Sequence, residues 1–481
     1  MDKLVTGRES PYWLVLTLIC LMFSWSEPVA EEVTVTLIHT SGFKGNLEQT
    51  LKIQPLFERI QRETGKALLL HAGSALSPGE SAYKGPGKSL TVSLMDKIGV
   101  DVWVPGGDDF ARSPDELSTF SRDASFPILG ANLHRADETG RSLSQIQPFT
   151  IVSMGRLKIG ILGLSAGGNR IEVGDPVQAA RYYVPLLREA ADAVILLTHL
   201  SFKADSTLAE EVGGIDIILG AQSTAGSITI NDVLIGYASS IEGSVGRIDL
   251  TFAEGQLYST GFNLLSIKEG QGPSLSGILV GWTAEVDGQM MPAAAVIGTS
   301  GGGFGSSLGT SSAMGHLIAD LMRIFVGSDL AFVAASNVDP DLPEGPITVL
   351  DLFRVYGWAN QVVIVSVKGS QIRDFLEGVL KTTGGFFYPS GLQVVYDPSA
   401  KKGDSITSIL VGNQPLDDNK SYRATVEDRI ATSEGSGKGL ADFLDASGRA
   451  ETGVMIRDLL ARHIQTLSQI KGSVDDRVQE K

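Results

Sequence analysis

The stretch "VTLIHTSGFKGNLE", from Val35 to Glu48, joins an apolar, β-branched strand directly to a loop of small residues. Such a junction is typical of α/β proteins, which place binding and catalytic groups in the loops that follow their strands. This loop, however, contains Gly42 and Lys44, where an active site would need carboxylates or imidazoles. The stretch therefore predicts a fold more clearly than it predicts a reaction.

Apolar strands alternate with amphipathic helices along the first half of the chain. Helices are expected at residues 53–65 and 90–99, and each of them closes on a glycine, as helices commonly do. After Gly220 shorter strands follow without long helices between them, so we expect a sandwich-like α/β domain. The strands expected before that point lie at residues 33–40, 66–73, 101–107, 126–133, 157–165, 191–200 and 215–220.

The composition indicates a globular protein with more than one domain. The chain has 481 residues, of which 43% are hydrophobic and 20% are charged, and this is enough apolar material for at least two cores. Its formal net charge is −16, which argues against a nucleic acid as partner because the phosphate backbone would be repelled. A plain contribution to solubility is the simplest reading of that charge.

The N-terminus has the anatomy of an export signal. Two basic residues, Lys3 and Arg8, precede the apolar run from Tyr12 to Trp25, and a polar segment follows. We expect a signal peptide over residues 1–30 and a periplasmic or secreted location, with membrane contact only through this segment; an uncleaved anchor is the alternative. Removal of the segment also removes the only cysteine, Cys20, and so excludes disulfides and thiolate chemistry.

We divide the rest of the chain into four parts. A first domain is expected over residues 31–268 and a second over residues 313–471. Between them, residues 269–312 are expected to form a linker with a helix near residues 275–285 and a Gly/Ser-rich boundary, "GTSGGGFGSSLGTSS". The polar tail, residues 472–481, is expected to fray.

The phrases at the strand ends resemble one known family when they are taken in order. They are "LIHTSGFKGNLE", "LLLHAGSALSPG", "VPGGDDF", "ILLTHLS" and "IDIILGAQST", followed by "GHLIADLMR", "LFRVYGWANQVV" and "GGFFYPSGLQVVYD". The chain resembles the secreted 5'-nucleotidase and UDP-sugar hydrolase family. This resemblance implies an α/β fold: an N-terminal four-layer αββα sandwich like that of metallophosphoesterases, followed by a 5'-nucleotidase C-terminal α/β domain.

Family members hold two divalent metals with seven side chains, and the resemblance assigns a position in this chain to each of them. Only one of the seven positions retains a family ligand, the imidazole of His199. The position of the family's catalytic histidine holds Asp108, with Asp109 beside it. The seven positions are Gly42, Lys44, Ser74, Gly107, His199, Gln222 and Thr224.

These substitutions predict that the family's metal centre is absent. Glycine offers no ligand and the Lys44 ammonium would repel cations, so we expect neither a dinuclear site nor any other cofactor. Lys44 is instead expected either to pair with Asp108 or Asp109, replacing the lost positive charge, or to be an ordinary exposed lysine. A site rebuilt from His71, His199 and these aspartates stays open, against a structural role for each.

The second domain resembles the family's nucleotide-binding domain with similar losses. The family's "NGGGIR" phrase corresponds to residues 334–339, "AASNVD", so its phosphate-binding arginine becomes Asp339. A base-stacking aromatic is retained as Phe386, and Asn360 fits the pattern of the family. These two residues are the candidates for binding a nucleoside-like small molecule, while a packed hairpin is the plainer interpretation of Phe386 and Phe387.

Three functions are compatible with these observations. The first is a periplasmic, non-catalytic binding or scaffold protein that descends from a nucleotidase. The second is a phosphoester or nucleotide hydrolase that works through a rebuilt site. The third is a subunit of a cell-envelope complex, in which the fold supplies only an interface to an envelope protein. The missing ligands favour the first, so on balance we expect no enzyme activity.

Overall fold

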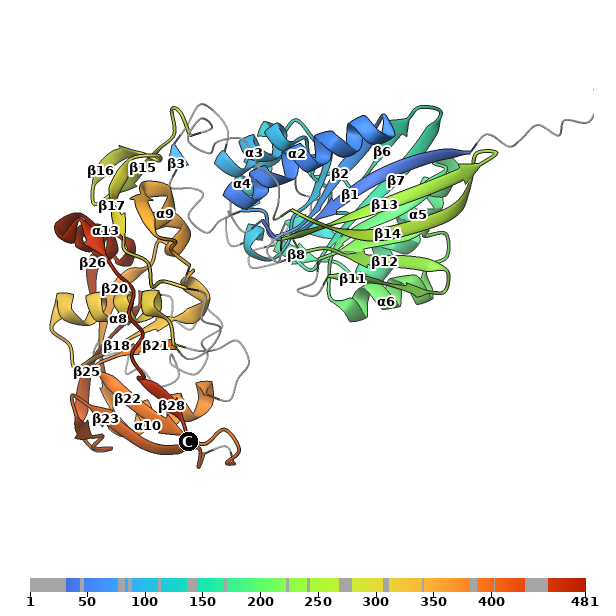
Figure 1. Cartoon of the computed structure of the whole chain (residues 1–481). Coiled ribbons are helices and arrows are strands. Elements are labelled where there is room, and N and C mark those ends of the chain that lie inside the picture. The colour runs from blue at the N-terminus through green and yellow to red at the C-terminus, as the bar shows by residue number, and fades with distance from the viewer. Residues whose placement is uncertain are drawn as a thin grey trace, which may run out of the picture.

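The structure is a computed structural model of the whole chain, in which two α/β domains follow one another (Figure 1). The expected signal peptide lies outside the residues that the structure describes. Within those residues, no helix is long and apolar enough to cross a membrane. The structure describes residues 32–43, 47–76, 83–84, 89–110, 114–135, 143, 145–167, 171–221, 225–239, 243–267, 279–305, 311–339, 341–380, 387–401, 403–428 and 449–481.

Two β-sheets form the centre of the first domain. The first sheet has the order β14-β13-β1-β2-β4 and the second has the order β11-β12-β10-β9-β7-β6. The strands of the first sheet are β1 (Val33–Thr40), β2 (Ala67–Ala72), β4 (Val102–Val104), β13 (Ser244–Ala253) and β14 (Gln256–Ser266). The strands of the second are β6 (Phe149–Met154), β7 (Leu157–Ser165), β9 (Ala193–His199), β10 (Ile217–Gly220), β11 (Gly226–Ile230) and β12 (Val233–Tyr237).

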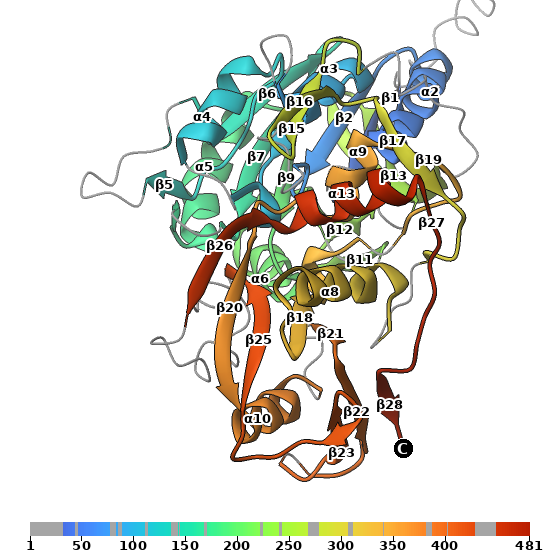
Figure 2. The same ribbon diagram turned by 90° about the vertical axis from the view of Figure 1, so that its left-hand side faces the viewer.

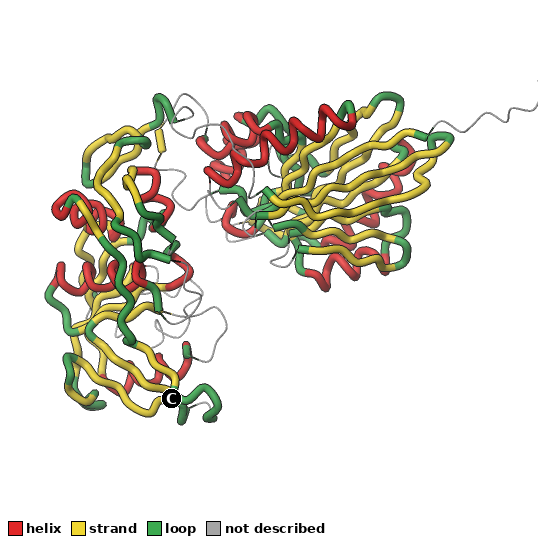
Figure 3. Tube along the Cα trace, viewed as in Figure 1, coloured by secondary structure: helices red, strands yellow, loops and turns green. Residues whose placement is uncertain are grey.

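The two sheets pack face to face through aliphatic side chains, among them Leu37 and Leu70 from the first sheet and Ile195 from the second. Helices cover both outer faces, as the colouring in Figure 3 makes plain. This arrangement is the expected four-layer αββα sandwich. The helices over the first sheet are α2 (Leu47–Thr64), α3 (Leu90–Ile98) and α4 (Pro114–Asp123), and those over the second are α5 (Pro176–Ala190) and α6 (Phe202–Glu211).

The register of the first sheet brings the loops after its strands to one edge. Strand β1 runs parallel to β2, with Thr40 opposite His71, and β2 runs parallel to β4, with His71 opposite Trp103. The prediction that residues 33–40, 67–71 and 102–104 are neighbouring strands is confirmed. Short elements complete the domain: the 3-10 helix η2 (Gly107–Phe110), β5 (Leu133–Arg135) and β8 (Ile171–Val173). The two-residue strand β3 (Tyr83–Lys84) pairs instead with residues 283–284, which belong to a sheet of the second domain.

The second domain is built around a five-stranded sheet, seen from the side in Figure 2. Its order is β21-β18-β25-β20-β26, and helices α8 and α10 contribute to the cores on its two faces. The strands are β18 (Leu330–Ala334), β20 (Gln361–Lys368), β21 (Phe387–Ser390), β25 (Ser421–Glu427) and β26 (Ala450–Met455). The helices are α8 (Ala313–Val326), η3 (Ala335–Asn337), α9 (Val349–Val355), α10 (Gly369–Val379) and α13 (Ile456–Leu467).

Smaller sheets join the rest of this domain. One has the order β16-β15-β3, another β19-β17-β27 and a third β24-β23-β22-β28. Their remaining strands are β15 (Thr283–Val286), β16 (Gln289–Pro292), β17 (Val296–Ser300), β19 (Gly345–Thr348), β22 (Leu392–Tyr396), β23 (Ile406–Val411), β24 (Gln414–Pro415), β27 (Gln469–Ile470) and β28 (Val478–Glu480).

Two expectations about local structure are wrong. The described part of the expected helix at 275–285 ends in strand β15, which forms a hairpin with β16 because turn residues, Asp287 and Gly288, both adopt positive φ. The C-terminal tail does not fray: β28 pairs with β22, and Arg477 forms two parallel hydrogen bonds of 2.8 Å to the Asp320 carboxylate. In addition, β17 pairs with β19, so structure of the second domain begins inside the expected linker.

Candidate functional site

The candidate site lies where strands β1, β2, β4 and β9 end. The amide of Gly42 donates to the carbonyl of Gly73 at 3.0 Å, and the amide of Ser74 donates to the carbonyl of Gly106 at 3.1 Å. The loops after three strands are therefore joined to one another by backbone hydrogen bonds. His199, the last residue of β9, reaches the same place from the second sheet, where its Nδ1 lies 3.3 Å from the carbonyl oxygen of Ala72.

The His199 ring is packed tightly against glycine backbone. A Cβ atom added to Gly73 would lie 2.0 Å from His199 Nδ1, and one added to Gly106 would lie 2.1 Å from Cγ of the ring. Both distances are far inside van der Waals contact. Glycine at these two positions is thus a requirement for the observed position of the imidazole.

Gly107 also lies against the His199 ring. Its φ is +57°, and a Cβ atom there would lie 2.7 Å from Ser74 Oγ and 3.2 Å from His199 Nε2. Ser74 also has a positive φ, +53°, which is uncommon for a residue with a side chain. The structure therefore brings together four of the seven family ligand positions: Gly42, Ser74, Gly107 and His199.

The remaining family positions cannot be placed in the same detail. Lys44, Gln222 and Thr224 lie outside the described residues, so the expected ion pair of Lys44 stays a prediction. The backbone of Asp108 is part of η2, but its side chain is also outside the description.

Asp109 links two of the site loops. Its side chain is 1% exposed; Oδ1 accepts a hydrogen bond from the amide of Leu76 at 2.8 Å, and Oδ2 accepts one from the amide of Gly106 at 3.0 Å. Both carboxylate oxygens therefore bind backbone donors of the loops after β2 and β4.

Two further histidines lie inside the sandwich. His71 is fully buried; its Nδ1 lies 2.9 Å from Thr40 Oγ1 and its ring stacks on Phe43 with centroids 3.8 Å apart. Burial lowers the pKa of His71 well below its usual value and lowers that of His39 to about 4. Both rings are neutral at physiological pH, and the burial of His71 argues against its use as a catalytic base beside His199.

A buried carboxylate that the sequence analysis missed lies beside the same edge. Asp205 on α6 is fully buried, accepting hydrogen bonds from the Thr198 hydroxyl at 2.8 Å and the Tyr237 hydroxyl at 3.0 Å. Desolvation raises the pKa of Asp205 to about 6. Its spacing is the signal that could have revealed it, because Asp205 shares the inner face of α6 with Leu208 and Ala209.

The donor set does not fit two divalent cations. Glycine at 42 and 107 supplies no ligand atom, and the serine hydroxyl at 74 is a poor substitute for a bridging carboxylate. Nor does any group of three or more His, Cys, Asp or Glu side chains in the described part of the chain come close enough to hold a metal.

In the second domain, a buried carboxyl group lies beside the loop of residues 334–339, which the sequence analysis compared with the nucleotide-binding loop of the family. Glu427, at the end of β25, is fully buried, and its carboxylate accepts hydrogen bonds from the amide of Ala334 at 3.2 Å and from Asn337 Nδ2 at 3.1 Å. The Tyr356 hydroxyl donates to the same carboxylate, and Asn360 Nδ2 lies 3.5 Å from Oε1. We call these five residues, Ala334, Asn337, Tyr356, Asn360 and Glu427, the Glu427 cluster.

The contacts of this cluster bear on the two residues that were predicted to bind a ligand, Asn360 and Phe386. Asn360 is 3% exposed, and its amide also lies 3.2 Å from the Tyr356 hydroxyl, so its donors are used internally. Phe387 packs edge-on against Phe375 in the core, with centroids 5.1 Å apart, so the expected packing is present. The expected hairpin is not, because β21 pairs with β18 and the next strand, β22, belongs to another sheet. Phe386 lies outside the described residues, so its stacking role stays a prediction.

Comparisons with known proteins agree with this architecture. The family model described as "5'-nucleotidase, C-terminal domain" matches residues 296–442. Over 96% of this chain and 92% of the relative, the chain is 23% identical to a 5'-nucleotidase of Diplobatis ommata. It is 21% identical to the protein UshA of Yersinia enterocolitica, over 91% of this chain and 92% of the relative. The trifunctional nucleotide phosphoesterase protein YfkN of Bacillus subtilis is 21% identical over 93% of this chain, which spans 35% of YfkN.

Solved structures place the same fold over nearly the whole chain. The structure of a 5'-nucleotidase precursor from Thermus thermophilus superposes with a TM-score of 0.73 at 22% identity, covering 93% of this chain and 99% of the other. The sulfate thiohydrolase SoxB of Thermus thermophilus superposes with a TM-score of 0.66 at 17% identity, covering 93% and 96%. The chain therefore carries a 5'-nucleotidase C-terminal domain over residues 296–442, and over nearly its whole length it is similar to 5'-nucleotidases in sequence and in fold.

Proposed function

We propose that the chain is an exported, non-catalytic member of this family that acts as a binding or scaffold protein. One observation carries the proposal. Among the four family ligand positions that the structure describes, His199 alone has a metal-binding side chain, and glycine backbone encloses its ring. A two-metal phosphoesterase needs ligands on both cations to lower the pKa of the attacking water and to hold the phosphoryl oxygens.

The way in which the loops are held supports the same proposal. Hydrogen bonds from Gly42 to Gly73 and from Ser74 to Gly106 join the strand ends, and Asp109 binds two further amides. These contacts hold the site loops together through the protein's own groups. The proposed export to the periplasm or outside the cell depends on the apolar run from Tyr12 to Trp25.

Metal analysis and phosphatase assays test the proposal together. Protein purified without chelator should contain no stoichiometric divalent metal, and it should not hydrolyse AMP or p-nitrophenyl phosphate when manganese, cobalt or zinc is added. Two metal equivalents per chain with 5'-nucleotidase turnover would contradict the proposal. Activity without metal would instead favour the alternative, a phosphoester or nucleotide hydrolase with a rebuilt site.

A gain-of-ligand variant makes the test sharper. The double substitution Gly42→Asp with Lys44→His restores two family ligands but leaves Ser74, Gly107, Gln222 and Thr224 unchanged. We expect no metal-dependent activity from it, because four ligands are still missing. Turnover in this variant would mean that the site is less altered than its residues indicate.

A further inference from the structure

Charged side chains, as well as strand pairing, attach the C-terminal segment to the second domain. Strand β28 lies beside β22 in Figure 2, with Val478 opposite Val394. Just before this strand, the Arg477 guanidinium donates two hydrogen bonds of 2.8 Å to the carboxylate of Asp320 on α8. It also donates to the carbonyl of Pro389 in β21 at 2.9 Å. The guanidinium therefore joins the C-terminal segment to a helix and to the central sheet of the domain.

A buried histidine of α8 faces the same segment. His316 is 2% exposed, and its Nδ1 lies 2.9 Å from Oδ1 of Asp475. The Asp475 carboxylate also accepts hydrogen bonds from Nε of Arg477, at 2.8 and 2.9 Å. One carboxylate of the C-terminal segment thus contacts both a guanidinium and an imidazole. We call His316, Asp320, Asp475 and Arg477 the C-terminal clasp.

Three elements place groups around the His316 ring. Asp320 lies one turn further along α8, Asp475 and Arg477 come from the C-terminal segment, and Tyr388 of β21 packs edge-on against the ring with centroids 6.0 Å apart. Among the described residues, Nε2 of His316 has no hydrogen-bond partner. A neutral ring that carries its single proton on Nδ1, opposite Asp475, fits these surroundings.

Protonation of this ring is unfavourable where it lies. The new N–H at Nε2 would be buried with no acceptor in the described part of the chain, and a second positive charge would be added beside Arg477. Burial lowers the pKa of His316 below its ordinary value of 6.5, and the neighbouring guanidinium lowers it further, while the two carboxylates oppose this shift. The attached C-terminal segment therefore favours the neutral form of His316.

We propose that the C-terminal clasp is a pH-sensitive attachment, which holds β28 on β22 while His316 is neutral and releases it when His316 is protonated. Release carries Asp475 and Arg477 away from α8 and gives the imidazole access to water. A hydrated imidazole takes up a proton at its ordinary pKa, so protonation and release favour each other. The sign follows: attachment is strongest above pH 6.5 and weakens as the pH falls below that value.

The size of the effect has an upper limit. At about pH 5.5, a histidine with a pKa of 6.5 in the released state shifts the equilibrium toward release by at most about tenfold. Burial opposes ionisation of Asp320, but the hydrogen bonds from Arg477 and Ser390 hold its pKa below the ordinary value, so this ion pair persists at that pH. A change between about pH 7.5 and 5.5 therefore reports the histidine.

Hydrogen–deuterium exchange of the full chain at these two pH values tests the proposal, with rates corrected for the intrinsic pH dependence of exchange. In the wild type, protection of the β28 amides should fall several-fold, by no more than about tenfold, at the lower pH. His316→Asn keeps a donor for Asp475 but cannot be protonated, so its β28 protection should be equal at both pH values.

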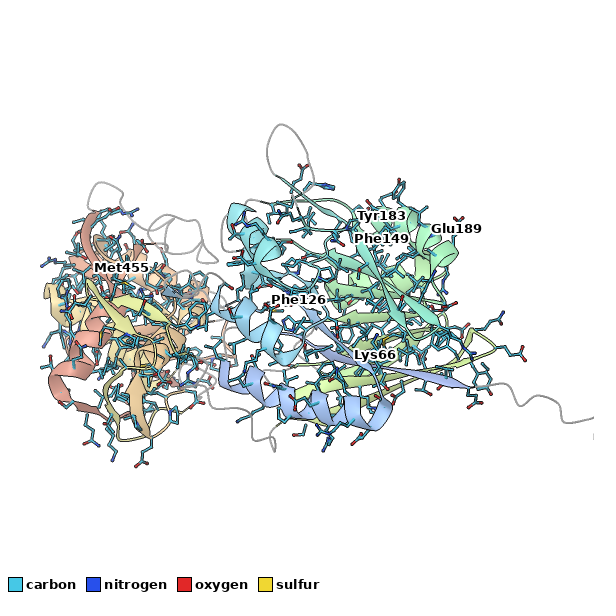
Figure 4. The ribbon with its side chains drawn as sticks, turned by 90° about the horizontal axis from the view of Figure 1, so that it is seen from above. Lys66, Phe126, Phe149, Tyr183, Glu189 and Met455 are labelled. Atoms are coloured by element: carbon cyan, nitrogen blue, oxygen red, sulfur yellow. The ribbon has the colours of Figure 1, made fainter. Side chains whose placement is uncertain are left out.

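A matched control is available in the same domain. His463→Asn replaces a histidine whose pKa burial also lowers, on the helix α13. This helix begins after Met455, which is labelled on the second domain in Figure 4. The control should keep the pH dependence of β28 protection that the wild type shows.

NMR titration gives a second measurement that does not depend on the stability of the variants. The ring signal of His316, assigned by its absence from the spectrum of His316→Asn, should titrate below pH 6.5 in the full chain. A pKa of His316 at or above that value overturns the proposal. So does β28 protection that does not fall on acidification of the wild type, or that falls equally in His316→Asn.

Discussion

Two regions of the chain, which by resemblance correspond to the metal-binding and nucleotide-binding loops of 5'-nucleotidases, satisfy their polar groups in different ways. In the first domain, the strand-end loops carry glycine and are joined by backbone hydrogen bonds around His199. In the second domain, a buried carboxylate, Glu427, receives hydrogen bonds from backbone and side chains of loop 334–337 and from Tyr356. The first region is held by backbone hydrogen bonds, and the second contains a buried carboxyl group whose pKa is raised by its burial. A loop that is buried without a ligand can therefore be kept stable in two ways: it can lack polar side chains, or its polar side chains can form hydrogen bonds with one another.

The largest effect on stability is expected from a substitution that removes the central carboxylate of the Glu427 cluster. Glu427→Ala leaves the buried hydroxyl of Tyr356 and the partly buried donors of Ala334 and Asn337 without their acceptor. We expect a loss of about 3 kcal/mol or more in the free energy of unfolding, since each unsatisfied buried group costs about 1 to 3 kcal/mol. Urea denaturation measures it.

The control for this change is Glu285→Ala, which removes an exposed glutamate. Glu427→Gln should lie between the two, because an amide keeps one acceptor. A Glu427→Ala variant as stable as the control would mean that the cluster is loose in solution.

The second prediction concerns the buried carboxylate of the first domain, Asp205, which accepts hydrogen bonds from Thr198 and Tyr237. Because the pKa of Asp205 is raised to about 6, its ionised form is destabilising: folding stability is highest below the unfolded pKa and falls as the pH rises to about 6. Asp205→Asn removes this dependence. The difference in unfolding free energy between variant and wild type should change by roughly 3 kcal/mol between pH 3.5 and 7.

Denaturation at a series of pH values checks this expectation, with Glu210→Gln on the exposed side of α6 as the control. A difference between Asp205→Asn and wild type that is constant over this pH range would show that Asp205 titrates normally.

The third prediction tests the compactness of the rebuilt site around His199. Gly107→Asn restores a family ligand, but its Cβ would contact Ser74 Oγ and the His199 ring, so overpacking should cost about 1 to 3 kcal/mol. The control is Gly155→Asn, which has a similar φ of +64° and no atom within 4 Å of the added Cβ.

Both variants place a side chain on a backbone with positive φ, so the difference in their free energies of unfolding, measured by heat or urea, reports the cost of the contacts around Gly107 alone. Equal stabilities would indicate that the space around His199 is open, and zinc binding by Gly107→Asn alone would contradict the absence of a metal site.

The smallest expected effect concerns ligand binding by the second domain. By resemblance, the position of the family's phosphate-binding arginine holds Asp339, whose pKa is raised by burial, so this side chain offers no positive charge to a phosphate. Stacking on Phe386 alone would contribute about 1 to 3 kcal/mol. Adenosine should therefore bind weakly, and at least as tightly as AMP, in isothermal titration calorimetry. Phe386→Ala should abolish that binding, whereas clearly tighter binding of AMP would reject the prediction.

The sequence predicted the sandwich because its signals are local. The spacing of apolar residues predicts strand β1 and helix α3. Gly99, which ends α3 with a φ of +84°, is the glycine at which the helix was expected to end. The proposed loss of metal ligands rests on single positions of the sequence and stays a prediction. Their clustering required the register of the sheet, which brings Ser74 and Gly107 to the same edge.

Features that depend on distant partners could not be predicted in this way. Glu427 looks like an exposed charge at a strand end, and only the fold brings it to Asn337 and Tyr356, which are 90 and 71 residues away. Similarly, "SVDDRVQEK" reads as a polar tail, because its partners Asp320 and β22 lie far back in the chain.

The position of β28 also constrains the order in which the second domain can fold. Val478 of β28 pairs with Val394 of β22, so this edge of the sheet is closed by residues far along the chain from their partner. A contact between residues so far apart in sequence requires the closure of a long loop, which makes it slow to form. The pairing of β28 is therefore expected to come late in folding, and until then β22 exposes an unpaired strand edge that is open to aggregation.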